Sequence, residues 1–195
     1  MEIPTRALLL ALGTLGPQAP QAVVVPAPLP FILPGGPSHD SKDHLPLLLG
    51  ETTPKAILAH RASFRENLAQ VKVTEALRAR WKAVRQPFTL VAVFGSWCGD
   101  SHRQLPHLLA LQTDSNPFIE VHYLGVNRNK ALEAGLWPKG CKPQSVDLVP
   151  TFYLFALGPG GRLKRVGSIE ETPPKAGQTM SLALVEMVEA AGRAL

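Results

Sequence analysis

Residues 88–101 of this chain read FTLVAVFGSWCGDS, and this stretch decides the fold. The first half is almost wholly apolar and rich in β-branched and aromatic side chains, which is typical of a strand buried on both faces. The second half holds a tryptophan, a cysteine and two glycines, and an amphipathic segment follows it as far as Gln112. We therefore predict a buried strand over 88–94, a sharp turn, and a helix that begins at Cys98.

The position of Cys98 has a chemical consequence. A cysteine in the first turn of a helix lies beside unpaired backbone N–H groups and the positive end of the helix dipole, and both favour the thiolate. The thiolate is the form that attacks disulfides. Asp100 opposes this effect through its negative charge, whereas a protonated His102 would support it. The flanking Trp-Cys-Gly sequence favours a reactive thiol over an inert buried one.

The remaining pattern alternates between helices and strands. Thr53 caps an expected helix with Pro54 in its first position, and a second helix fits 73–85. Gly158-Pro159-Gly160-Gly161 marks a hairpin between two apolar runs. The other expected elements are strands over 119–126, 151–157 and 162–169, a short irregular helix near 128–135, and a last helix over 181–191. This order predicts an α/β domain with a mixed central sheet and helices on both faces.

Two separated motifs carry a resemblance to a known family. Trp97-Cys98-Gly99-Asp100-Ser101, with Pro106 beyond it, resembles the thioredoxin active-site signature Trp-Cys-Gly-Pro-Cys and its helix-kinking proline. Val149-Pro150-Thr151, before an apolar strand, resembles the cis-proline loop of that family. The resemblance covers about 72–195 and implies a thioredoxin-like fold. More narrowly, the chain is similar to a bacterial branch of thioredoxin-like proteins that carry a WCGDS motif behind a helical extension.

The resemblance implies roles for individual residues. Cys98 and Ser101 occupy the two catalytic positions, and the expected substrate-binding residues are Trp97, Gly99, Asp100, Val149 and Pro150. Trp97 would form an apolar rim, with a packed structural side chain as the alternative. The substrate would be an extended segment held by exposed backbone groups near Pro150.

Three departures from the family weaken the usual dithiol cycle. Ser101 stands where the second, resolving cysteine belongs, and a serine oxygen cannot release a mixed disulfide. Ala92 replaces a buried acid, and Asp100 replaces the proline between the two cysteines. We therefore expect a single-cysteine exchange protein that forms mixed disulfides with protein thiols or glutathione and needs an external thiol reductant. No cofactor is expected.

Cys141 is the only other cysteine. It lies in a loop between Lys139 and Lys142, an electropositive setting that would lower its pKa and suit it to resolve a disulfide on Cys98. The alternative is an incidental thiol, since sequence alone does not bring the two Cα atoms within about 7 Å.

Other functions remain as alternatives. A redox-inactive binding or chaperone-like module would keep the fold and the peptide groove without turnover. Nucleic-acid binding through the basic face of 73–85 (Arg78, Lys82 and Arg85) is less favoured, because exposed aromatic residues do not interleave with the charges, and a solvated face explains them. Cys98 and His102 lie one helical turn apart with His107 nearby, but no further ligands gather there, so no metal site is expected.

The amino-terminal part has a different composition. Residues 1–37 hold 8 of the 19 prolines, with an apolar run behind Arg6 that resembles a signal peptide and a Pro-rich tether after it. This predicts export to the periplasm or beyond, with a cytoplasmic tail as the alternative. Residues 38–71 form an expected helical extension, and 72–195 form the main domain. No run approaches the roughly 20 apolar residues of a membrane-spanning helix, so stable membrane insertion is not expected.

Overall fold

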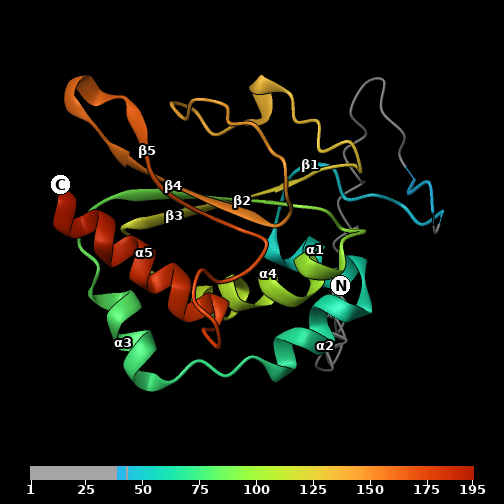
Figure 1. Ribbon diagram of the computed structural model, residues 1–195, viewed down its shortest axis with the longest axis horizontal. Coiled ribbons are helices and arrows are strands. Elements are labelled where there is room, and N and C mark those ends of the chain that lie inside the picture. Colours follow the sequence, from blue (N-terminus) through green and yellow to red (C-terminus); the bar gives the residue numbers. More distant parts are fainter. Residues whose placement is uncertain (1–38, 43) are drawn as a thin grey trace, which may run out of the picture.

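The computed structural model describes residues 39–42 and 44–195 (Figure 1). The signal-like segment and tether expected over 1–37 lie outside the described residues. Within the part described, no helix is both long and apolar enough to cross a membrane.

A five-stranded sheet forms the centre of the molecule (Figure 1). Its spatial order is β1-β3-β2-β4-β5, in which β2 and β3 are parallel and every other neighbouring pair is antiparallel. The strands are β1 (Gly50–Thr52), β2 (Phe88–Phe94), β3 (Ile119–Gly125), β4 (Thr151–Leu157) and β5 (Leu163–Glu170). The predicted mixed sheet is therefore confirmed, with the all-apolar β2 at its centre and buried along its whole length.

In the described part of the chain five α-helices accompany the sheet, and Figure 1 shows α3, α4 and α5 on the same side of it. The helices are α1 (Pro54–His60), α2 (Ala62–Gln70), α3 (Glu75–Ala83), α4 (Gly99–Gln112) and α5 (Met180–Ala194). Thr53, Thr74 and Thr179 cap α1, α3 and α5 by accepting a hydrogen bond from a first-turn N–H.

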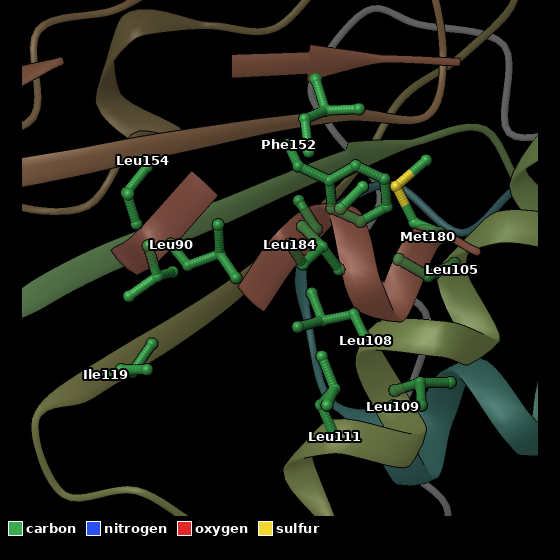
Figure 2. Close-up of a cluster of buried hydrophobic side chains, with 14 of the residues drawn as sticks. Leu90, Leu105, Leu108, Leu109, Leu111, Ile119, Phe152, Leu154, Met180 and Leu184 are labelled. Atoms are coloured by element: carbon green, nitrogen blue, oxygen red, sulfur yellow. The ribbon is translucent and has the colours of Figure 1, made fainter. Parts of the chain in front are cut away.

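The main core lies between this face of the sheet and the helices (Figure 2). Figure 2 shows Leu90 and Phe152 from the sheet meeting Leu105 and Leu108 of α4 and Leu184 of α5, all without solvent exposure. Burying a large aliphatic or aromatic side chain contributes about 1.5–3 kcal/mol. This core fixes α4, and therefore its first residues, against the end of β2.

The opposite face of the sheet is covered by a loop segment rather than by α-helices, which differs from the expectation of helices on both faces. Val91, Val93, Tyr153 and Phe155 pack there against the segment 126–150, whose described residues include one 3₁₀ turn, η1 (Ala134–Leu136), and no α-helix. The irregular helix expected near 128–135 is therefore wrong for most of its length. Trp137 supplies the burial that a helix would have given, through edge-to-face contacts with Tyr153 and Phe155.

The segment before the main domain also differs from expectation. Gly50–Thr52 is a sheet strand, which the sequence analysis missed because three residues show no periodicity and the strand exists through its antiparallel pairing with β3. The single helix expected after Thr53 is two helices, because Arg61 adopts an extended conformation (φ −135°, ψ 139°) between them. The predicted hairpin at 158–161 and the last helix are confirmed.

Candidate functional site

Cys98 lies where β2 gives way to α4. It is the N-cap of α4, its N–H donates to Gly95 O (3.0 Å), and its carbonyl accepts from His102 N (3.0 Å). The buried β2 and the buried face of α4 place this turn at the carboxyl end of the central strand, with the Cys98 side chain half-buried. The sequence prediction of a cysteine at the beginning of a helix is confirmed to within one residue.

The loop before β4 comes to the same place. The Cys98 sulfur lies 3.2 Å from the carbonyl oxygen of Val149, 51 residues away in the chain, and the Val149–Pro150 peptide bond is cis. The side chains of Val149 and Pro150 are buried, so Val149 offers the site its backbone rather than its side chain. Thr151 fixes the turn by donating its hydroxyl to Leu148 O (2.7 Å).

Leu148 was not identified from the sequence. Its side chain is 39% exposed next to the Val149 backbone, which makes it one of few large apolar side chains exposed in the described chain. The sequence feature that could have identified Leu148 is its position directly before Val149-Pro150. An exposed apolar side chain therefore borders the Val149 backbone that contacts Cys98.

The residues after Cys98 have distinct environments. Gly99 is exposed, and Asp100 forms an ion pair with Arg103 (2.5 Å) one turn along α4. Ser101 is fully buried, and its hydroxyl oxygen accepts from the backbone N–H of Gly95 (3.2 Å). Arg103 thus pairs with the Asp100 charge, while Ser101 closes the turn.

His102 faces the loop and the helix α2. Its Nε2 lies 2.8 Å from Ser96 O, and because a carbonyl only accepts, this nitrogen donates. Its ring packs edge-to-face on Phe64 at 4.7 Å between centroids. Its backbone carbonyl accepts from Asn67 Nδ2 (2.9 Å), so α2 holds the first turn of α4 in place.

Trp97 is packed on several sides. Its indole Nε1 donates to Val126 O (3.0 Å), and the Arg128 guanidinium lies 4.6 Å from the ring centroid. The ring also lies so close to Gly95 that a Cβ there would come within 2.6 Å of it. Trp97 is therefore a packed, half-buried side chain, and its role as an apolar rim for a substrate stays a prediction.

Cys141 corrects an expectation. Its side chain is buried with Trp137 and Tyr153 in the core beneath 126–150. Burial, with a smaller contribution from the Glu120 charge, raises the pKa of the Cys141 thiol to about 11. The flanking lysines are exposed to solvent, so the predicted lowering of its pKa is wrong. Both cysteines are free thiols, and Cys98 packs against the edge of the core that contains Cys141.

The basic helix α3 has its charges largely paired. Arg78 and Lys82 both form ion pairs with Asp114, and Arg80 pairs with Glu189 through two hydrogen bonds (2.9 and 2.7 Å). The hydrogen bonds from Lys82 and Arg78 lower the pKa of the Asp114 carboxyl. Among the residues described, no group of three or more metal-ligating side chains comes together.

A comparison with protein-family models agrees with this architecture. Residues 51–137, less than half of the chain, match the family model described as Thioredoxin. No curated protein matches. Two solved structures, a protein of unknown function from Pseudomonas aeruginosa and an HIV epitope-scaffold, each show 20% identity and a TM-score of 0.48, covering 75% of this chain and 94% of their own. The family match, the mixed sheet and the helices flanking it give the chain a thioredoxin-like fold.

Proposed function

We propose that this protein is a thiol–disulfide exchange protein that works through one nucleophilic cysteine, Cys98. The observation that carries the proposal is the placement of the Cys98 sulfur at the N-cap of α4, half-exposed and 3.2 Å from Val149 O. Backbone N–H groups at a helix N-terminus favour the thiolate, which is the attacking species.

The proposed reaction consists of two successive thiol–disulfide exchanges. The Cys98 thiolate attacks one sulfur of a disulfide, the Cys98–sulfur bond forms, and the other sulfur leaves as a thiolate. An external thiol, such as glutathione, then attacks the mixed disulfide and takes the substrate sulfur, and Cys98 returns to the thiolate. The external thiol supplies the electrons, because the buried Ser101 has no sulfur with which to attack.

The neighbouring loop provides a place for an extended substrate. Val149 has its backbone beside the sulfur, Leu148 exposes an apolar side chain, and Gly99 is exposed on the helix side. A bound segment would pair its backbone with Val149 and place its disulfide at Cys98. Protein disulfides and glutathione are therefore the proposed partners, and export by the signal-like segment would provide a compartment rich in disulfides.

The test is exposure of the folded protein to oxidised glutathione, followed by intact-mass measurement and peptide mapping. Wild-type protein and Cys141→Ser should both gain one glutathionyl group on Cys98, and Cys98→Ser should gain none. Comparing Cys141→Ser with Cys98→Ser shows which of the two thiols forms the mixed disulfide. Failure of the folded Cys141→Ser protein to form any mixed disulfide would overturn the proposal.

A second function has one specific observation in its favour. The contact from Cys98 Sγ to Val149 O (3.2 Å) holds the loop beside α4 without any reaction at the sulfur. A redox-inactive binding module would keep this contact and use the loop only to hold a peptide. Binding of an extended peptide that survives Cys98→Ser, without covalent capture by the wild type, would favour this function.

A further inference from the structure

The indole of Trp97 is held by an arginine from another part of the chain. The Arg128 guanidinium lies 4.6 Å from the ring centroid, while Nε1 donates to Val126 O (3.0 Å). A guanidinium over an indole face is attracted by the electrons of the ring. Arg128 therefore covers one face of Trp97, next in sequence to Cys98.

Asp40 in turn holds Arg128. The Arg128 Nε donates a hydrogen bond to Asp40 Oδ1 (3.0 Å), and Nη2 lies within ion-pair distance of Oδ2 (2.9 Å). Asp40 is only 1% exposed, and its Oδ1 also accepts from Lys42 N (2.7 Å). Burial and these contacts hold the Asp40 carboxylate in place, and the carboxylate orients the Arg128 guanidinium over the Trp97 ring.

A second contact ties the same amino-terminal segment to the same loop. Leu48 N donates to the Ser96 hydroxyl oxygen (3.0 Å) in a buried position. Leu48 O passes so close to Gly125 that a Cβ added there would lie 2.1 Å from it. The segment that holds Asp40 and Leu48 therefore reaches the turn that carries Cys98 directly at Ser96 and, through Arg128, at Trp97.

We propose that Asp40 and Arg128 are positioning residues that clamp Trp97 as one wall of the Cys98 site. Trp97, Cys98 and Val149 border the same small core, so the orientation of the indole sets the surface that a peptide disulfide meets at Cys98. This inference rests on the proposed exchange function for its kinetic part. The clamp itself is independent of any reaction at Cys98.

Two conservative variants separate charge from geometry. Asp40→Asn keeps the volume and removes the charge that holds Arg128, and Arg128→Lys keeps the positive charge but loses the planar stacking and the two-atom contact. Arg80→Lys is the matched control, since Arg80 of α3 also pairs with a carboxylate, that of Glu189 on α5, away from Trp97. Circular dichroism melts show which variants are folded.

Acrylamide quenching of tryptophan fluorescence measures the clamp. Trp81 and Trp137 are buried, so the half-buried Trp97 dominates the quenchable signal, and Trp97→Phe identifies its share. Asp40→Asn and Arg128→Lys should increase quenching of Trp97, and Arg80→Lys should leave it unchanged. Unchanged quenching in a folded Arg128→Lys protein, or an equal increase in Arg80→Lys, would overturn the clamp.

Kinetics measure the effect on the site. With a disulfide-bonded peptide as substrate, KM should rise about two- to thirtyfold in both clamp variants, the range expected for loss of a cation–π contact. Alkylation of Cys98 by iodoacetamide should stay near the wild-type rate, because this small reagent needs no Trp97 wall. Increased quenching with an unchanged KM would overturn the role in substrate positioning. If wild-type Cys98 exchanges with no disulfide, the proposed function fails, and quenching alone still decides the clamp.

Discussion

The hydroxyl oxygen of Ser101 accepts a hydrogen bond from the backbone N–H of Gly95 across 3.2 Å, entirely within the protein interior. Ser101 stands three residues after Cys98 on α4, and its contact joins the first turn of the helix to the end of β2. The residue in the resolving position is therefore a structural hydrogen-bond acceptor, placed close in sequence to the proposed nucleophile.

Replacement Ser101→Cys should restore a dithiol site. A sulfur at this position is close in size to the hydroxyl and could attack a mixed disulfide on Cys98 from within the molecule. We expect oxidised glutathione to produce an internal disulfide between Cys98 and the introduced cysteine, seen as a mass loss of two hydrogens. We also expect dithiothreitol-dependent reduction of insulin that the wild type lacks.

The control for this substitution is Ser101→Ala, which leaves the Gly95 N–H without its acceptor. It should cost about 1–3 kcal/mol in the free energy of unfolding and give no reductase activity. A folded Ser101→Cys protein that stays inert, although Cys98 is alkylated readily, would contradict the prediction.

The two thiols should differ sharply in reactivity. Burial raises the pKa of Cys141 to about 11, so at pH 8 the native protein should react with Ellman's reagent at Cys98 alone, and in guanidinium at both thiols. The raised pKa of Cys141 also makes the free energy of unfolding depend on pH. An unfolded thiol with a pKa of about 8.5 loses its proton before the folded one, so stability should fall as the pH rises above about 8.5.

Cys141→Ala should remove part of this alkaline loss, measured as the guanidinium midpoint at pH 7 and pH 10. Equal reaction rates for both thiols in the native protein would show that Cys141 is accessible, against the burial described above.

Acid should weaken the fold through His107. Desolvation by burial lowers the pKa of this side chain, whose Nδ1 lies 3.3 Å from the Ser181 hydroxyl. Below a pH of about 6.5 the unfolded chain takes up a proton that the folded protein resists, so stability falls as the pH falls through that value. One such group contributes at most about 1.4 kcal/mol per pH unit.

His107→Gln should shrink the difference between urea midpoints at pH 7.5 and pH 5.5. Burial also lowers the pKa of His60, so part of the acid loss should remain in the variant. An undiminished difference would assign the whole effect to other groups.

The packing of α2 on the domain can be tested at Phe64. This side chain has no solvent exposure and packs edge-to-face on Phe94 (6.1 Å) and His102 (4.7 Å). Phe64→Ala should cost about 3–5 kcal/mol, measured by urea unfolding. Phe118→Ala is the matched control, since Phe118 is 37% exposed and should cost far less. A loss from Phe64→Ala no larger than the small loss from Phe118→Ala would mean that α2 contributes little to the core.

Local pattern was enough for much of the fold. The apolar run of 88–94 predicted β2, the glycines at 158–161 predicted the hairpin, and helical spacing predicted α4 and α5. The Trp-Cys-Gly sequence placed Cys98 at a helix start, and the resemblance of Val149-Pro150 to a known loop identified the second half of the site. Each of these features depends on a few neighbouring residues, which a sequence shows directly.

Other features depend on residues far apart and could not be read in this way. β1 exists because three residues pair with β3, and Arg128 stacks on Trp97 because Asp40, 88 residues earlier, holds it. Cys141 lies between two lysines in sequence, yet the fold turns its thiol inward and leaves the lysines in water. The sequence by itself determined the periods of its strands and helices and the position of Cys98 at the start of α4. Only the tertiary structure decided which side chains desolvate one another, because burial and charge pairing depend on three-dimensional neighbours rather than on sequence order.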